Sequence, residues 1–207
     1  MGKFSPCFLL FVIFTTSNIV YGLDENSVKE KKCFEPDLSS VDLDYGWVFS
    51  FNRWYFTHMS KLDLYRSAWD TLQKKTTDIK ENEVETPCLY ADWEGFTPSM
   101  TGFGEKTLEY DITPNLDNTF NFATSWRNGV GGKMSLVKTN NKNYLLFVKC
   151  WDHDDQMSWN VMATTTTLGE QEKKEIYDKI ESLGFSKEFI FEQKFDTCKI
   201  KEKKSEL

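Results

Sequence analysis

The segment Asp152-His153-Asp154-Asp155 combines three carboxylates with one of the two histidines of the chain. Acidic side chains around an opening focus positive potential into it, so this segment predicts an entrance that attracts a cation, with Asp154 as a candidate ligand contact. An ordinary charged turn would explain the same pattern. The other histidine, His58, could join His153 at a metal ion, but the sequence fixes no third ligand, and no metal site is predicted.

Aromatic side chains are unusually frequent, with 7 Trp, 8 Tyr and 17 Phe. Such side chains fill protein cores and also line apolar pockets. Trp151 and Trp159 flank the acidic segment, where they would form a cation–π wall for a protonated amine. Packing on the outside of the fold, against a helix, is the alternative, and the sequence leaves both open.

Neither catalysis nor nucleic-acid binding is expected. The sequence contains no Gly-x-Ser-x-Gly elbow, no His-Glu-x-x-His motif and no phosphate-cradling glycine-rich loop. Two histidines leave little for nucleophilic chemistry, so we expect no enzyme activity and no cofactor. A formal charge of −7 provides no basic face for a phosphate backbone.

The first 22 residues are expected to form a signal peptide. Lys3 precedes a short apolar run at 8–14, and Val20-Tyr21-Gly22 offers a cleavage site. The remainder, residues 23–207, is expected to form one domain. It contains no other run that is apolar enough to span a membrane, so the protein is expected to be secreted, monomeric and not membrane-bound.

Four cysteines remain after removal of the signal peptide: Cys33, Cys88, Cys150 and Cys198. An even number in a secreted chain predicts two disulfides, with three possible pairings. The spacings are too long for the paired hooks of a zinc site.

Most of the chain consists of short strand-forming runs separated by turn residues. The expected strands are 51–58, 86–93, 107–112, 119–126, 134–138, 144–151, 158–165 and a last run at 188–195. Residues 59–69 lack clean periodicity and are expected to form a long loop with at most a helical turn. One amphipathic helix is predicted over 169–183. Strands followed by one helix predict an eight-stranded antiparallel up-and-down β-barrel with a C-terminal helix and a ligand-sized cavity.

Alternation within these strands indicates which side chains face the barrel interior. Leu108 and Tyr110 are expected inside and Glu109 outside. In the next strand, Phe120 and Phe122 share one face and are candidate ligand contacts.

Three features make the sequence resemble a lipocalin. Trp54-Tyr55 stands in the place of the Gly-x-Trp signature, although Asn52 replaces its glycine, and the turn at 139–144 is similar to the Thr-Asp-x-x-x-Tyr turn of the family. The order of strand, helix and terminal cysteine over 158–198 also fits. The segment 54–58 and the tail 185–198 resemble the nitrophorin and triabin group, the salivary lipocalins of blood-feeding bugs.

The resemblance implies several properties. It implies the pairings Cys33–Cys150 and Cys88–Cys198. It implies that Trp54 lies at the barrel floor, that Phe56 lines the pocket and that His58 lies near the mouth. The family alignment would also turn Glu109 inward, against the apolar alternation. The fourth strand has no histidine at 107–111, so the resemblance is to haem-free members.

The function implied by the resemblance is that of a secreted lipocalin that sequesters a small apolar or amine ligand in its barrel, as a salivary anti-haemostatic scavenger. One alternative is an inhibitor whose acidic surface binds host clotting or platelet proteins. The other is a bilin or pigment carrier of the insect apolipoprotein D type.

Overall fold

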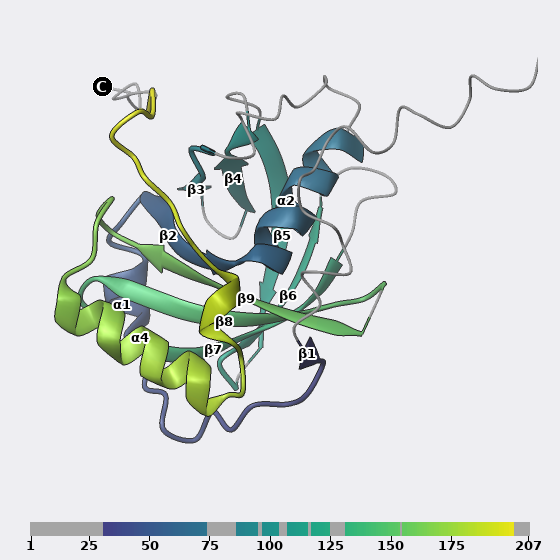
Figure 1. The fold of residues 1–207 in the computed structure, drawn as a ribbon, viewed down its shortest axis with the longest axis vertical. Helices are drawn as coiled ribbons and strands as arrows, with labels where there is room; N and C mark the ends of the chain where they lie inside the picture. Colours follow the sequence, from purple (N-terminus) through teal and green to yellow (C-terminus); the bar gives the residue numbers. More distant parts are fainter. Residues whose placement is uncertain are drawn as a thin grey trace, which may run out of the picture.

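The computed structural model describes residues 31–73, 86–94, 97–103, 107–115, 117–124, 131–153 and 155–200, so the predicted signal peptide lies outside the described residues. Strands β2 to β9 are Arg53–Ser60, Tyr90–Glu94, Thr97–Thr101, Thr107–Pro114, Thr119–Thr124, Gly131–Thr139, Tyr144–Trp151 and Gln156–Ala163. The short strands β1 and β10 are Lys31–Lys32 and Ile190–Glu192. The helices are α1 Tyr45–Val48, α2 Lys61–Gln73 and α4 Glu170–Ser182, with a 3-10 turn at Lys187–Phe189 (Figure 1).

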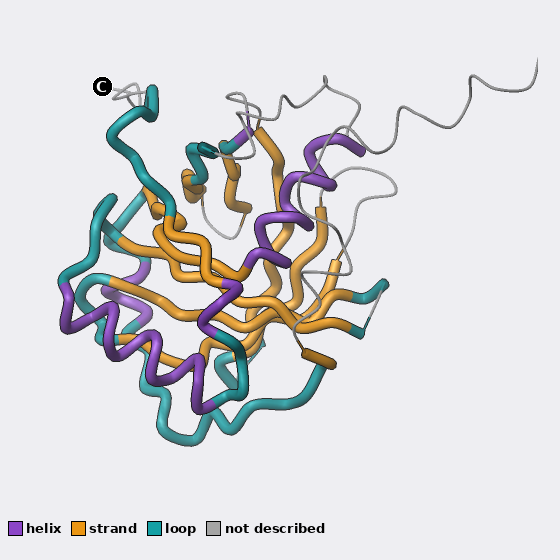
Figure 2. Tube along the Cα trace, in the orientation of Figure 1, coloured by secondary structure: helices purple, strands orange, loops and turns teal. Residues whose placement is uncertain are grey.

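Strands β2 to β9 form a closed antiparallel barrel. Each strand pairs with the next along the chain, and β9 pairs back with β2, so that Phe56 lies opposite Met162 and Met59 opposite Asn160. Strand β1 adds to β9, and β10 adds to the far end of β2. The prediction of an eight-stranded barrel with a C-terminal helix is confirmed, and Figure 2 shows the strands as one curved wall with that helix outside it.

Strands β7 to β9 have an apolar layer on each of their two faces. On β8, Leu145 and Phe147 face the barrel interior, whereas Leu146 and Val148 face outward. Helix α4 packs Ile176 against this outer face, beside β7 and β8 in Figure 1. The outer face of these strands is therefore as apolar as the inner one, because the helix covers it.

The ends of α4 follow from its sequence. The Glu172 carboxylate accepts a hydrogen bond from the Gly169 backbone N–H before the first turn, and Lys179 lies in the last turn, where a cation is favoured. Gly184 then adopts φ +84°, a conformation that ends helices and that other residues rarely take.

An aromatic cluster closes one end of the barrel. The Asp44 carboxylate accepts a hydrogen bond from the Trp47 backbone N–H and caps α1. This places the Trp47 ring edge-to-face against Trp54, with 5.2 Å between ring centroids, and Phe51 packs on Trp54 at 5.8 Å. Trp54 is 1% exposed, in agreement with the position at the floor that the resemblance implied.

Helix α2 lies at the opposite end, where a loop was predicted over residues 59–69. That prediction is wrong. Leu64 and Ala68 of α2 belong to the inner core, and Leu62 and Tyr65 are buried as well. Leu62 and Tyr65 are three residues apart and Leu64 and Ala68 four apart, so the spacing of an amphipathic helix is present in the sequence and the loop prediction missed it.

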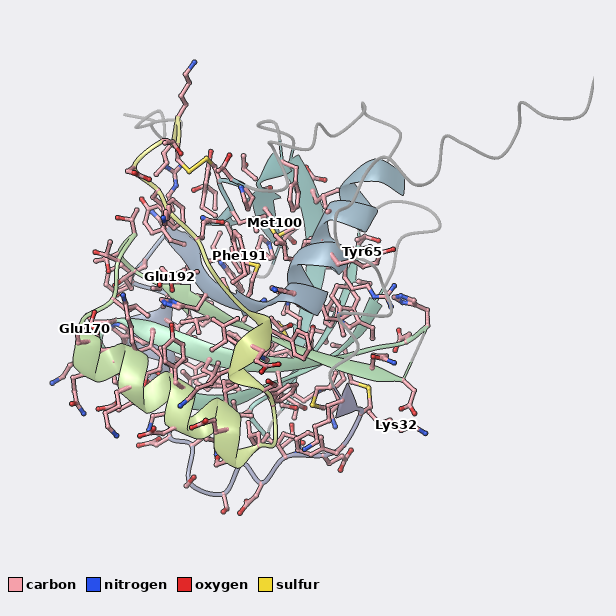
Figure 3. All side chains as sticks on the ribbon, viewed as in Figure 1. Lys32, Tyr65, Met100, Glu170, Phe191 and Glu192 are labelled. Carbon is pink, nitrogen blue, oxygen red and sulfur yellow. A yellow bond between two sulfur atoms is a disulfide. The ribbon has the colours of Figure 1, made fainter. Side chains whose placement is uncertain are left out.

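The structure contains the two disulfides Cys33–Cys150 and Cys88–Cys198, drawn as yellow bonds in Figure 3, and the implied pairing is confirmed. The second bridge holds the segment after β10 against the barrel. There the buried Gln193 side chain accepts a hydrogen bond from the Leu89 N–H and donates one to the Leu89 carbonyl. In the described residues, no helix combines the length and the apolar character that crossing a bilayer requires.

Candidate functional site

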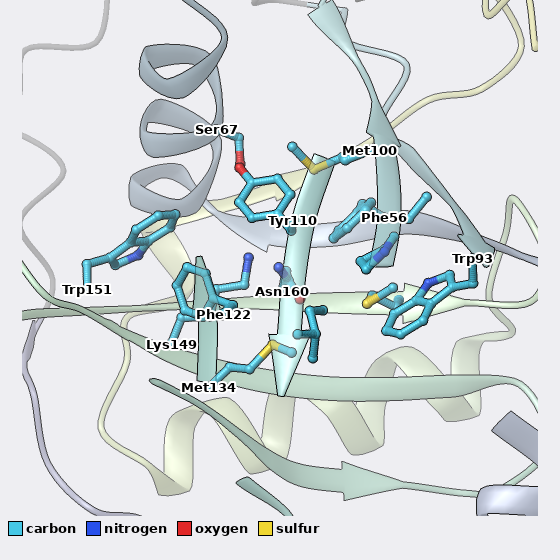
Figure 4. Close-up of a pocket in the computed structure, with 14 residues that line it drawn as sticks. Phe56, Ser67, Trp93, Met100, Tyr110, Phe122, Met134, Lys149, Trp151 and Asn160 are labelled. Carbon is cyan, nitrogen blue, oxygen red and sulfur yellow. The ribbon is translucent and has the colours of Figure 1, made fainter. Parts of the chain in front are cut away.

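The barrel contains a partly open cavity beneath α2, which we call the barrel cavity (Figure 4). About 50 Å³ of it is open to the centres of water molecules, which is room for a small group and not for a large ligand without adjustment. Most of the lining is apolar or aromatic. The lining residues are Phe56, Ser67, Ala91, Trp93, Pro98, Met100, Tyr110, Ile112, Phe122, Met134, Lys149, Trp151, Asn160 and Met162.

A buried carboxylate organises the polar side of this cavity. Asp63, in the first turn of α2, is 1% exposed. Its Oδ1 accepts a hydrogen bond from the Ser158 Oγ at 2.8 Å, and its Oδ2 accepts one from the Asn160 Nδ2 at 2.9 Å. The Lys149 Nζ lies 3.1 Å from Oδ1 and 3.2 Å from Oδ2. We call these four residues the Asp63 cluster.

The Asp63 cluster links α2 to the barrel wall. Ser158 also accepts a hydrogen bond from the indole N–H of Trp151 at 2.9 Å, which fixes the ring orientation of that lining residue. The Lys149 ammonium lies 5.9 Å from the Phe122 ring centroid and 5.7 Å from that of Trp151. Lys149 therefore contacts the Asp63 carboxylate of α2 on one side and lies near the rings of Phe122 and Trp151 in the cavity on the other.

Two buried polar atoms in the cavity lining have no hydrogen-bond partner in the described part of the chain. They are the indole Nε1 of Trp93, a donor, and the Oδ1 of Asn160, an acceptor. Each unpaired buried group of this kind costs free energy, commonly about 1–3 kcal/mol. A cavity that leaves a donor and an acceptor unpaired is suited to a molecule that supplies the missing partners.

Four of the predicted ligand contacts line the barrel cavity: Phe56, Tyr110, Phe122 and Trp151. Tyr110 reaches toward Ser67 of α2 in Figure 4. Two further predicted contacts, Leu108 and Phe120, belong to the inner core without lining the cavity. Ligand binding by all of these residues stays a prediction.

The register of β5 follows the apolar alternation. Leu108 is 1% exposed and Glu109 is exposed on the outer side, so the inward Glu109 of the family alignment is wrong.

His58 is not near the mouth of the barrel, and the position that the resemblance implied for it is wrong. The pairing of β2 with β9 shifts register between Phe56 and His58, which makes Thr57 an extra residue and reverses the alternation beyond it. Met59 therefore points into the core, and His58 points outward under α4.

His58 is buried under α4. Its ring packs edge-on against Tyr177 with 5.8 Å between centroids, and its Nε2 lies 3.5 Å from the Glu192 carboxylate. Burial lowers the pKa of His58 to about 4, against the opposing influence of Glu192, while Lys173 lowers it further. The imidazole is therefore neutral at pH 7 and takes no part in the barrel cavity.

Of the other predicted mouth residues that the structure describes, Trp151 lines the cavity, whereas Trp159 and His153 do not. Trp159 is fully buried in the outer layer under α4, and so of the two alternatives for this residue, packing outside the barrel is the one observed. His153 is exposed, with its ring 6.1 Å from Trp151, and Asp154 lies outside the described residues. Within the described ranges, no three His, Cys, Asp or Glu side chains are grouped as metal ligands would be.

Sequence reasoning did not find the polar part of the site. Asp63, Lys149, Asn160 and Trp93 come from one helix and three different strands. No spacing in the sequence links them, because the barrel closure alone brings them together. The only available signal is local: Lys149 falls at an inward position of β8, whose other inward residues are apolar.

No protein-family model and no curated protein matches the sequence. Solved structures do match in fold. Insecticyanin from the tobacco hornworm Manduca sexta is 14% identical over 82% of this chain and 90% of its own, with a TM-score of 0.54. Lobster apocrustacyanin A1 is 12% identical over 81% of this chain and 91% of its own, with a TM-score of 0.52. Apocrustacyanin C2 is 11% identical over 80% and 89%, with a TM-score of 0.51. The chain therefore has the fold of the lipocalin superfamily.

Proposed function

We propose that this protein is a carrier that binds a small, mainly apolar molecule in the barrel cavity. The observation that carries the proposal is the cavity itself, which lies inside the barrel and is lined mainly by aromatic and aliphatic side chains from its strands. A monomeric barrel with no use for this space would be expected to fill it, because a void in a protein core costs stability.

The proposal extends to where the protein acts. Two disulfides support a protein that folds in an oxidising compartment and works outside the cell. The resemblance of 54–58 and 185–198 to the haem-free triabin group supports a role as a scavenger in saliva. On this proposal, the protein removes its ligand from solution and needs no catalytic group.

Titration calorimetry with propylbenzene and 3-phenylpropan-1-ol tests the central claim. Both molecules suit an aromatic lining, and both are larger than the open volume, so their binding requires lining side chains to adjust. Ala91 lines the cavity, and Ala91→Leu adds three carbon atoms there, which should weaken binding about tenfold or more. The matched control is Ala123→Leu on an exposed position of β6, which should bind as the unmodified protein does.

Native mass spectrometry and an absorbance scan of the purified protein complete the test. A co-purified small molecule would support the carrier and show whether it is coloured, as a pigment carrier requires. If neither probe binds and no small molecule co-purifies, the carrier proposal is wrong and inhibition of clotting or platelet proteins becomes the function to assay.

A further inference from the structure

The Asp63 cluster bears on which molecules the barrel cavity accepts. We propose that its ligand is an uncharged, mainly apolar molecule with at least one hydroxyl or carbonyl oxygen, and that the cavity rejects both protonated amines and carboxylates. This inference rests on the proposed function, since it assumes that the barrel cavity is the binding site.

The first argument is the balance of charge. Lys149 is the only described lining residue that carries a charge, and Asp63 neutralises it at 3.1 Å. Both side chains are withdrawn from solvent, with 14% of Lys149 and 2% of Asp63 exposed. A charged ligand entering this cavity would lose its hydration and find no net opposite charge, which is unfavourable for either sign.

The second argument is that the Asp63 carboxylate is fully used. A carboxylate has about four acceptor positions. Ser158 and Lys149 occupy those of Oδ1, and Asn160 and Lys149 occupy those of Oδ2. A protonated amine would have to displace Lys149 to reach this carboxylate. A carboxylate ligand that approached Lys149 would come close to Asp63 and be repelled by it.

The third argument is what remains unpaired. The Trp93 Nε1–H needs an acceptor and the Asn160 Oδ1 needs a donor. A carbonyl oxygen pairs with the first, and a hydroxyl group pairs with either, because it both donates and accepts. Uncharged oxygen groups therefore satisfy the lining without disturbing the Asp63 cluster.

A matched set of four probes tests this at pH 7: propylbenzene, 3-phenylpropan-1-ol, 3-phenylpropylamine and 3-phenylpropanoate. They share a skeleton and differ in one terminal group. By calorimetry, the alcohol is expected to bind most tightly, about five- to tenfold more tightly than propylbenzene, as one hydrogen bond would provide. The amine and the carboxylate are each expected to bind at least tenfold more weakly than the alcohol.

Two variants separate the causes. Asp63→Asn leaves the Lys149 charge without its counterion, so the carboxylate probe should gain at least tenfold in affinity while the amine does not. Trp93→Phe removes the indole N–H and should reduce the ratio by which the alcohol binds more tightly than propylbenzene. The matched control is Trp159→Phe. It also removes an indole N–H that has no partner among the described residues, but from the outer layer, and should leave the ratio of the two affinities unchanged.

Equal binding of all four probes, or tightest binding of the amine or the carboxylate, would overturn this inference and leave the carrier function standing. Binding of none of them, together with the absence of any co-purified small molecule, would overturn the carrier function itself. If Asp63→Asn does not fold, the order of the four affinities in the unmodified protein still tests whether the cavity prefers an uncharged oxygen-bearing ligand.

Discussion

Lowering the pH from 7 to 5 should remove about 2 kcal/mol of folding stability through the single side chain of His58. In the folded protein, burial lowers the pKa of His58 to about 4. In the unfolded chain the imidazole titrates near its ordinary value of about 6.5. As the pH falls through that value, the unfolded chain takes up a proton and the folded protein does not. The stabilisation is complete above about pH 6.5 and is lost as the pH falls toward 4.

The size of the effect follows from the separation of these two pKa values. That separation corresponds to about 3 kcal/mol in total, of which about 2 kcal/mol falls between pH 7 and pH 5. The charged groups that face His58 are Glu192 of β10 and Lys173 of α4, which are paired with each other at 2.9 Å, and Tyr177 of α4 faces it as well. The hydrogen bond from Lys173 lowers the pKa of Glu192, so this carboxylate stays ionised over the same range.

The assay is urea unfolding followed by tryptophan fluorescence at pH 7 and pH 5, for the unmodified protein and for His58→Phe. Phenylalanine keeps a ring against Tyr177 and removes two ring nitrogens that have no hydrogen-bond partner among the described residues. The variant should lose about 2 kcal/mol less than the unmodified protein over this interval. The exposed His153 provides the control, because His153→Gln should keep the full pH dependence. An equal loss in the unmodified protein and in His58→Phe would refute the reasoning.

Three further changes should destabilise the fold in measurable ways. Asp63→Ala leaves the buried Lys149 ammonium unpaired and should cost about 3–5 kcal/mol in urea unfolding; a cost below about 1 kcal/mol would mean that the ion pair does not hold α2 in place. Cys198→Ser removes one bridge and should lower the unfolding free energy by about 2–5 kcal/mol, and an unchanged midpoint in urea would contradict this. Gln193→Ala removes both side-chain hydrogen bonds to the Leu89 backbone and should cost about 1–3 kcal/mol; hydrogen exchange at the Leu89 amide should become faster, and unchanged protection would speak against the role assigned to Gln193.

The barrel could be predicted because its strands keep a period of two. In β6, Phe120 and Phe122 point inward and Asn121 is exposed, so that the sequence and the burial agree. The same logic failed at β2, where one extra residue reverses the alternation and nothing in the sequence marks it. Alternation could not decide whether Trp159 faces the interior or the outside of the barrel, because both faces of β9 are buried, one by the core and the other by α4.

The apolar half of the site could be predicted and the polar half could not. Tyr110 and Phe122 were identified by alternation, Phe56 through the resemblance, and Trp151 by its position beside the acidic segment, and all four line the cavity. Asp63 was not predicted because a charged residue in an expected loop suggests exposure. In the structure it lies in α2, and three donors compensate its buried carboxylate.

The connectivity of the two disulfides has a consequence for the route by which the protein folds. The bridges interleave along the chain, joining Cys33 to Cys150 and Cys88 to Cys198, over separations of 117 and 110 residues. The chain is synthesised from its N-terminus, so Cys33 and Cys88 can react with each other before either native partner, Cys150 or Cys198, has been made. A bond between them would be non-native and must be exchanged before the two native bridges can form. Recovery of the native protein from its reduced form should therefore depend on thiol–disulfide exchange, and a mixture of reduced and oxidised glutathione should give more native protein than oxidation by air.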